Sequence, residues 1–397
     1  MVKKTGPSRK VAPSKQSSSS KQSSKKLSAP LETSSPALQS EEQQQRLLNI
    51  FSSAFNNVLT SDDFSRLLQE IKQALFNREF AAAFGREDYL EAYAARWSPT
   101  RALCYAAVFL SIKKHLDGIL IAKEETKDTT NITKEGSVSY TKIAGSTQDD
   151  ANDKPEGTEL EIFQDLKLDS TSTRRNAALR MLSVGGCAAE HVAFASYLQT
   201  TATDGHLTLL DSGPWTTVIS LLESSTVNPP PISKYASTAR QAANHPLLEN
   251  NQLSLDVVQR DVLDLDMDSL SAQCANGRVP IILTLLFTLN ELYTTAGIGK
   301  TTKFLKNLGQ VLASDSLVLV VDSPGSYSEA ALGKEKKRYP MQWLLDHTLI
   351  ETETPGYSWE KLQSDDSIWF RLPEGLSYPI PLENMRYQMH LYRLQKP

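Results

Sequence analysis

From about residue 176 onward, the chain alternates short apolar runs with segments of helical periodicity, and this alternation constrains the fold most. The apolar runs span residues 178–184, 206–210, 254–262, 279–289 and 316–321. Strands that alternate with helices predict a mostly parallel sheet with helices on both faces. Two further runs, 367–372 and 387–394, are joined by a polar, proline-containing stretch that leaves no room for a helix. We therefore expect the last two strands to be antiparallel.

Composition divides the 397 residues into four regions. Residues 1–40 are rich in Ser, Lys, Gln and Pro, and with so little apolar surface to bury they should form a disordered basic tail. Residues 41–121 show helical periodicity and are expected to pack on the sheet domain as a lid. Residues 122–160 are expected to form an acidic, polar insertion. Residues 161–397 are expected to form the sheet domain.

The charges are unevenly distributed between the tail and the rest of the chain. The chain has a net charge of -4, whereas residues 1–40 carry eight basic residues and one acid, a net of +7. The rest of the chain is therefore acidic. Clustered lysines attract phosphate through counterion release, so the tail is typical of a nuclear address or a contact to a polyanion. The acidic total does not argue against an RNA partner.

Several classes of protein are disfavoured by the residues that are missing. The three cysteines form no CxxC pair and the six histidines form no HExxH or HxH pair, so we predict no metal site and no disulfide framework. The longest apolar run, residues 281–289, is too short to span a membrane as a helix, and no signal-peptide pattern follows the first lysines. Residues 297–301 end like a phosphate-binding loop but lack its first glycine, because that position is Thr294. We expect a soluble intracellular protein.

One helix start has a strong local signal. Ser98 can cap a helix and Pro99 suits its first position, which predicts a helix over 99–115.

The residues that follow each predicted strand are candidates for a binding site, because ligands of open α/β sheets bind at the carboxyl ends of strands. The first strand ends in Gly185-Gly186-Cys187, a turn of small residues that opens a helix over about 187–199. Asp211 follows the second strand, where a carboxylate can accept both hydroxyls of a ribose. Asp261 and Val262 follow the third, where an acid can accept from an adenine amino group. This series indicates an adenosine-bearing ligand.

The form of the glycine turn restricts that ligand further. A dinucleotide site would require G-x-G-x-x-G, and the chain has Gly185-Gly186 followed by Cys187, Ala188 and Ala189. Pyrophosphate binding is therefore disfavoured. S-adenosylmethionine has no phosphate and tolerates a shorter turn with fewer glycines.

The second half of the chain resembles the class I S-adenosylmethionine-dependent methyltransferases. Within them it is similar to the fungal family that includes a 25S ribosomal RNA uridine-N3 methyltransferase. The resemblance is carried by residues 96–103, 182–190, 286–293, 321–327, 369–371 and 378–387. The strings Asn-Glu-Leu-Tyr at 290–293 and Glu-Asn-Met-Arg-Tyr at 383–387 are its most specific parts.

The resemblance implies a Rossmann-like, seven-stranded α/β sheet with an antiparallel last strand, preceded here by the helical extension and the basic tail. It implies S-adenosylmethionine as cofactor and methylation of a uridine N3 in large-subunit ribosomal RNA. The partner would be ribosomal RNA or the pre-ribosome, with no membrane and no metal. The location would be the nucleus or nucleolus, and the resemblance also allows the cytoplasm.

Strand-end position and resemblance together predict three groups of site residues. Cofactor contacts are expected from Gly185, Gly186, Cys187, Glu190, Asp211, Asp261, Val262 and Thr288. The catalytic pocket is expected to include Asn290 and Tyr293. RNA contacts are expected from Arg96, Arg101, Arg371 and Arg386. Trp97, Trp215 and Trp369 either stack a base or fill the core.

Two departures from the class keep other functions open. Ser183 stands where the class usually has an acid, and Cys187 stands where a glycine is common. One alternative is a methyltransferase of the same fold that acts on a protein or a small molecule. The other is a catalytically inactive ribosome-assembly factor.

Overall fold

The structure is a computed structural model that describes residues 33–34, 38–122, 177–242, 244–325, 327–332 and 335–397. The predicted disordered tail, apart from residues 33–34 and 38–40, lies outside the described residues. The predicted insertion at 122–160 also lies outside them, apart from residue 122.

Seven strands of five or more residues form the central sheet. They are β3 (Ala177–Val184), β4 (Asp204–Asp211), β5 (Leu253–Gln259), β6 (Ile282–Leu286), β7 (Leu317–Asp322), β10 (Ser358–Phe370) and β11 (Met385–Gln395). Their order across the sheet is β10-β11-β7-β6-β3-β4-β5. The strands from β3 to β7 pair in parallel, and β11 is antiparallel to both β7 and β10. The predicted α/β sheet with an antiparallel final pair is confirmed.

Two strands of two residues extend this sheet. β1 (Thr33–Ser34) pairs in parallel with Ile368 and Trp369 of β10, and β2 (Ile121–Ala122) pairs with the start of β3. A separate hairpin is formed by β8 (Tyr327–Leu332) and β9 (Glu335–Pro340).

Three strands differ by three or more residues at one end or both from their predicted bounds, each for a local reason. β6 is shorter than 279–289 because Pro280 lacks a ladder donor and residue 289 already begins a helix. β5 ends before Asp261, whose side chain accepts a hydrogen bond from Leu263 N (2.9 Å) and caps a short 3₁₀ turn. β10 begins nine residues before 367, in a polar stretch whose alternation is interrupted by two bulges.

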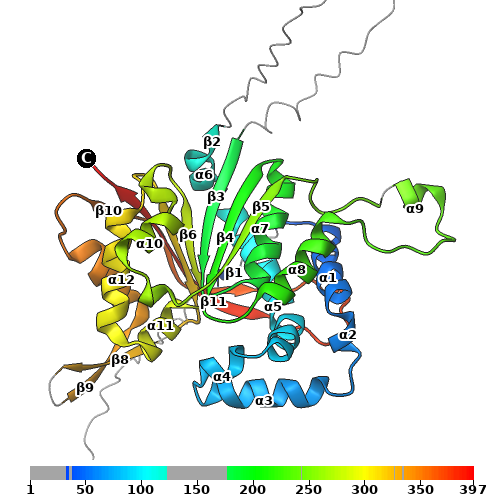
Figure 1. The fold of residues 1–397 in the computed structure, drawn as a ribbon, viewed down its shortest axis with the longest axis horizontal. Coiled ribbons are helices and arrows are strands. Elements are labelled where there is room, and N and C mark those ends of the chain that lie inside the picture. Colours follow the sequence, from blue (N-terminus) through cyan, green and yellow to red (C-terminus); the bar gives the residue numbers. More distant parts are fainter. Residues whose placement is uncertain (1–32, 35–37, 123–176, 243, 326, 333–334) are drawn as a thin grey trace, which may run out of the picture. The chain divides into compact units, whose positions relative to one another are not determined.

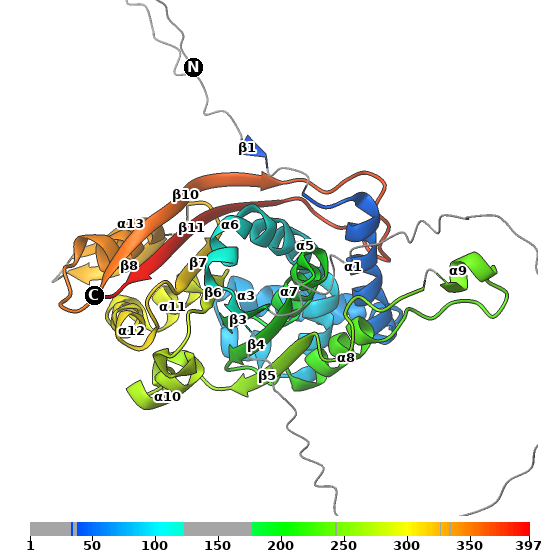
Figure 2. The same ribbon diagram turned by 90° about the horizontal axis from the view of Figure 1, so that it is seen from above.

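Helices cover both faces of the sheet (Figures 1 and 2). One face carries α1 (Glu41–Ala54), α5 (Glu87–Ser111), α7 (Ala188–Thr201) and α8 (Thr216–Val227). The other carries α10 (Met267–Gln273), α11 (Leu289–Thr295), α12 (Gly297–Val311) and α13 (Met341–Asp346). The remaining α-helices are α2 (Asn56–Leu59), α3 (Phe64–Phe76), α4 (Phe80–Phe84), α6 (Lys113–Leu116) and α9 (Thr238–Ala242). No helix of the described ranges is long and apolar enough to cross a membrane.

The predicted helix start at Ser98 is wrong, because α5 begins at Glu87 and carries Pro99 in its interior. A proline there removes the N–H that would bond to the carbonyl of Ala95 and costs about 3 kcal/mol. The Tyr378 hydroxyl donates to that carbonyl instead (2.8 Å). Most of α5 is buried, so tertiary packing outweighs the local preference for a break.

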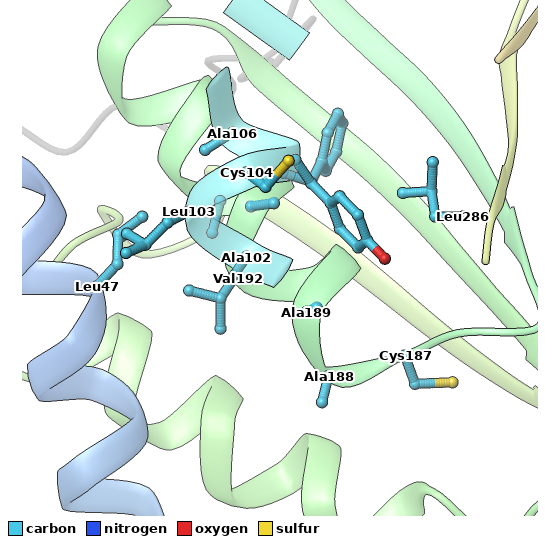
Figure 3. Close-up of a cluster of buried hydrophobic side chains, with 14 of the residues drawn as sticks. Leu47, Ala102, Leu103, Cys104, Ala106, Cys187, Ala188, Ala189, Val192 and Leu286 are labelled. Carbon is cyan, nitrogen blue, oxygen red and sulfur yellow. The ribbon is translucent and has the colours of Figure 1, made fainter. Parts of the chain in front are cut away.

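Small side chains bring α5 close to α7. Figure 3 shows Ala102 and Ala106 of α5 beside Ala188, Ala189 and Val192, at the start of α7. All of these side chains are nearly or fully excluded from solvent. Alanines allow two helix backbones to approach closely, so this contact holds the middle of α5 against the first turn of α7.

Candidate functional site

A cavity of about 290 Å³ opens at the carboxyl ends of the parallel strands. Its floor comes from the residues after β3, β4, β5, β6 and β7, which include the glycine turn, Asp211 and Asp261. Its opposite wall comes from the helices that precede the sheet in sequence. That wall contains Leu75, Phe80, Phe84, Tyr93, Trp97, Ser98 and Arg101. Figure 1 shows α3 and α4 at this end of the sheet.

The glycine turn after β3 needs both of its glycines. Gly185 has a φ of +72°, and a Cβ on it would lie 2.2 Å from Cγ2 of Thr288. A Cβ on Gly186 would lie 2.4 Å from Oε1 of Glu190. The Thr288 hydroxyl donates to the Gly185 carbonyl (2.9 Å), so Thr288 positions the turn.

A buried carboxylate and a cation meet beside this turn. Glu190 is 4 % exposed, and burial raises its pKa to about 7 although Arg101 opposes the shift. Arg101 donates to the Tyr93 hydroxyl, and its guanidinium lies 4.9 Å from the Phe287 ring centroid. Burial by itself disfavours the charged guanidinium, but Tyr93, Tyr105 and Glu190 raise the pKa of Arg101 above its ordinary value. Arg101 therefore remains a cation in the cavity.

Further acids line the strand ends. Asp211 accepts from Gly213 N (2.7 Å), and its pKa is raised by burial. Burial, and then the charges of Asp211 and Asp322, raise the pKa of Glu291 to about 7. Asp322 accepts from the backbone N–H groups of Asn290 (3.0 Å) and Ser323 (2.7 Å), which fixes the first turn of α11. A lining with so many acceptors favours a ligand that is cationic and rich in donors.

Asn290 and Tyr293, the two predicted catalytic residues, lie in different places. Asn290 lines the cavity, and among the described residues its buried Oδ1 has no hydrogen-bond partner. Tyr293 is 2 % exposed and packs with Leu289 in the core between α11, α12 and the sheet. Leu289 and Tyr293 are four residues apart on one face of α11, and this face is turned to the core. The structure does not bring Tyr293 into the cavity.

The predicted cofactor residues do meet at the cavity. Gly185, Gly186, Cys187, Glu190, Asp211, Asp261, Val262 and Thr288 all line it. Cys187 is 1 % exposed, and burial raises the pKa of its thiol. Ser183 is fully buried and accepts from the Thr284 hydroxyl on β6 (3.1 Å), so it faces the sheet interior.

The four predicted RNA-binding arginines separate into three positions. Arg101 lies in the cavity. Arg96 pairs with Glu383 (2.5 Å), and its guanidinium lies 5.8 Å from the Trp97 ring centroid at the cavity wall. Arg371 and Arg386 lie outside the cavity and flank the Trp369 ring, at 5.2 and 5.7 Å from its centroid.

Phe84 and Tyr93 of the aromatic wall, and two of the acids, are missing from the sequence prediction, which named Trp97 and Trp215. Tyr93 contacts the rings of Phe84, Trp97 and Trp215, with centroids 5.0, 5.0 and 6.2 Å away. The resemblance at residues 96–103 was a signal that this segment belongs to the site, but it did not place Phe84. Glu291 and Asp322 follow strands, and the strand-end rule that selected Asp211 could have selected them. Within the described ranges, no cluster of three or more His, Cys, Asp or Glu side chains could hold a metal ion.

Comparison with known proteins connects this geometry to a family. The profile of the family described as "Putative SAM-dependent methyltransferase" matches residues 51–393. The 25S rRNA (uridine(2843)-N(3))-methyltransferase of Saccharomyces cerevisiae is 26% identical over 364 residues, which cover 88% of this chain and 85% of that protein.

Two solved structures show a more distant likeness. A variant of the 16S rRNA (adenine(1408)-N(1))-methyltransferase from Catenulisporales acidiphilia has a TM-score of 0.31 and 12% identity, covering 57% of this chain and 91% of that chain. The N-methyltransferase NodS from Bradyrhizobium japonicum, in complex with S-adenosyl-L-homocysteine, has a TM-score of 0.26 and 9% identity, covering 54% and 77%.

The profile match covers the helical wall, the glycine turn and every strand end that lines the cavity. The chain belongs to this family of S-adenosylmethionine-dependent methyltransferases.

Proposed function

We propose that this protein transfers a methyl group from S-adenosylmethionine to N3 of a uridine in large-subunit ribosomal RNA. The observation that carries the proposal is the cavity at the strand ends, whose lining contains several acids together with Asn290, an amide whose oxygen has no hydrogen-bond partner among the described residues. The yeast relative, a 25S rRNA uridine-N3 methyltransferase by name, supports the choice of substrate.

The lining fits S-adenosylmethionine in charge and in hydrogen bonding. When bound, this cofactor supplies an electrophilic methyl group on a positively charged sulfur. Asp211 would accept the ribose hydroxyls, and Asp261 with Val262 would contact the adenine. Glu190 would hold the amino group of the methionine part, and Arg101 its carboxylate. The small residues of the turn, Gly185 to Cys187, leave space for the cofactor.

Asn290 and Glu291 would act on the acceptor base. The N3–H group is the single donor on the Watson–Crick edge of uracil, and Asn290 Oδ1 is an acceptor without a partner among the described residues. Glu291 is the next residue and also lines the cavity, so its carboxylate can take the N3 proton, and the bond from N3–H to Asn290 then breaks. The resulting nitrogen anion would accept the methyl group, with S-adenosylhomocysteine as the leaving group. A paired base hides N3, so the uridine must be unpaired or flipped out.

The remaining predicted arginines would bind RNA outside the cavity. Arg371 and Arg386 are exposed, as RNA phosphate contacts require. The partner would be ribosomal RNA or the pre-ribosome, and the location would be the nucleus or nucleolus, where that RNA is made. A fluorescent fusion that is excluded from the nucleus, nucleolus included, would contradict this location.

The decisive experiment uses ribosomal RNA from cells that lack the protein. The full-length protein and radiolabelled S-adenosylmethionine are expected to label this RNA, and mass mapping is expected to place the mark at N3 of one uridine. Asp211→Ala should reduce labelling strongly. Asp268→Ala, which removes an exposed carboxylate of α10 outside the cavity, is the matched control and should label normally.

Each alternative has its own outcome in this experiment. Label in protein or small molecules, and none in RNA, would contradict the proposed substrate. Failure to bind S-adenosylmethionine in a calorimeter would contradict catalysis and support an inactive assembly factor.

A further inference from the structure

The three tryptophans that could stack a base have different surroundings. Trp215 is 4 % exposed and follows β4. A Cβ placed on Gly213 would lie 3.2 Å from Nε1 of Trp215 and 3.2 Å from Oδ1 of Asp211, so Trp215 and Asp211 are close to each other. Trp369 lies outside the cavity. Trp97 is partly exposed and lines the cavity from α5. Only Trp97 among the three has both a ring surface available to a ligand and a place in the cavity wall formed by the N-terminal helices.

We propose that Trp97 is the platform on which the acceptor base stacks after it enters the cavity, and that Arg96 and Glu383 hold its ring in position. This inference rests on the proposed function, because it takes the acceptor to be a nucleobase. It adds to that function one base-binding residue, Trp97, and two positioning residues, Arg96 and Glu383. It also divides the cavity into a half for the acceptor base and a half for the cofactor.

Two residues of α5 contact the Trp97 ring. The Arg96 guanidinium lies 5.8 Å from its centroid, a cation–π distance, and the Tyr93 ring lies 5.0 Å away at 40°. Arg96 is itself held by Glu383 at 2.5 Å. Glu383 belongs to the segment between β10 and β11. A ring that is already held loses little conformational entropy when a base stacks on it.

The segment that carries Glu383 is anchored to α5 a second time. Tyr378, five residues earlier, donates to the Ala95 carbonyl, which Pro99 leaves without its helical donor. The same segment therefore contacts α5 at two adjacent residues, Ala95 and Arg96, which directly precede Trp97.

Position assigns Trp97 to the acceptor and Trp215 to the cofactor. Trp215 lies beside Asp211, which is expected to bind the ribose, and the Trp97 contacts are with Arg96 and Tyr93 of its own helix. Stacking on an aromatic ring accepts any base, because every base has a π-face. Trp97 would thus provide affinity for a base, and Asn290 would provide the preference for one with a donor at N3.

The test compares two RNAs on the wild type and four variants, without turnover. A short fluorescent RNA with one uridine, and the same RNA with an abasic site there, are titrated into full-length protein saturated with S-adenosylhomocysteine. Base–aromatic stacking is worth about 1–3 kcal/mol, so the wild type should prefer the uridine RNA by roughly 5- to 150-fold. Trp97→Ala should bring this ratio close to one, and Trp97→Phe should keep most of it.

A matched control and a second reading complete the design. Trp343→Ala removes a 43 % exposed tryptophan of α13 that lies outside the cavity, and it should keep the wild-type ratio. Glu383→Gln should lower the ratio partly by raising the Kd of the uridine RNA, with unchanged affinity for S-adenosylmethionine. The thermal unfolding of every variant is measured. Trp97→Leu keeps apolar volume without an aromatic ring and should also bring the ratio close to one, so it replaces Trp97→Ala if that variant does not fold.

The outcomes separate this inference from the proposed function. A wild-type ratio in Trp97→Ala would overturn the platform, whether or not the wild type methylates RNA. A loss of S-adenosylmethionine affinity in Trp97→Ala with an unchanged ratio would also overturn it and assign the ring to the cofactor. A wild type that discriminates uridine from the abasic site but methylates no ribosomal RNA would contradict the proposed function alone.

Discussion

At the residue scale, the cavity is governed by two glutamates whose pKa values lie close to neutrality. Burial raises the pKa of both Glu190 and Glu291 to about 7. Each carboxyl is therefore neutral in part of the molecules near pH 7, and a cationic ligand would favour the charged form. The same shifts make stability and activity depend on pH, in opposite directions.

For Glu190 the consequence is a loss of stability with rising pH. The folded protein holds the proton up to about pH 7, and the unfolded chain releases it near the ordinary value of 4.5. The free energy of unfolding should therefore fall as pH rises between these values. Glu190→Gln should remove the part of this dependence that comes from Glu190, leave the part from Glu291, and stabilise the protein at pH 8 by up to about 3 kcal/mol.

Denaturant unfolding across this pH range measures the effect. Glu374→Gln, an exposed substitution, is the control and should follow the wild type. Parallel pH curves for Glu190→Gln and the wild type would show that burial of Glu190 carries no such penalty.

For Glu291 the consequence concerns catalysis. If its carboxylate takes the N3 proton, single-turnover methyl transfer should increase with pH through about 7 and level off above, because only the ionised form accepts. Glu291→Gln should lose roughly 10²- to 10⁴-fold in rate, and the rise near pH 7 should disappear. A Glu291→Gln enzyme that keeps the wild-type pH profile would rule out this role.

At the element scale, α5 shows how a local signal and the tertiary structure can disagree. The pair Ser98-Pro99 is a good helix start by local rules, yet α5 continues through it because its surroundings bury it and Tyr378 satisfies the orphaned carbonyl. This donor comes from a residue 283 positions away, so no local pattern around Pro99 could reveal it.

A double-mutant cycle tests whether the Tyr378 hydroxyl replaces the backbone N–H donor that Pro99 lacks. Tyr378→Phe should destabilise the protein by about 1–3 kcal/mol, because the Ala95 carbonyl loses its partner in a buried place. In a Pro99→Ala background the helix regains its own N–H donor, so Tyr378→Phe should cost clearly less. Chemical denaturation of the wild type, the two single mutants and the double mutant gives the coupling free energy. Strictly additive effects would show that the Tyr378 hydroxyl does not replace the missing donor of Pro99.

The elements of the sheet were far easier to predict than the complete site. Apolar runs marked the strands, and topology then assigned Asp211, Asp261 and Asn290 to one edge, where the structure places them. Tyr293 failed as a pocket residue because its i, i+4 partner Leu289 already marked a core-facing side. Phe84 and Glu383 reach Tyr93 and Arg96 only through the tertiary fold, so sequence order alone could not assign them.

At the scale of the whole molecule, charge is divided between a basic N-terminal sequence and an acidic remainder. Residues 1–32 carry all eight basic residues of the tail, and they end just before β1. Deleting 1–32 should weaken RNA binding at low salt and flatten its salt dependence, by up to about 5 in the slope of log K against log salt. Affinity for S-adenosylmethionine should not change.

Anisotropy titrations over a range of salt concentrations measure that slope. Replacing the eight basic residues with glutamine is the matched control, since it keeps the length and should give the same loss. An unchanged slope in either protein would show that the tail does not contact RNA phosphate.

The position of β11 inside the sheet has a consequence for synthesis. All other described strands precede β11 in the chain, yet β11 lies between β7 and β10. On the ribosome, the parallel strands can therefore assemble early, but the open edge of β7 stays unpaired until residues 385–395 have emerged. An unpaired edge invites association with other nascent chains. Translation pauses before residue 385 should thus increase aggregation more than pauses elsewhere in the sheet domain.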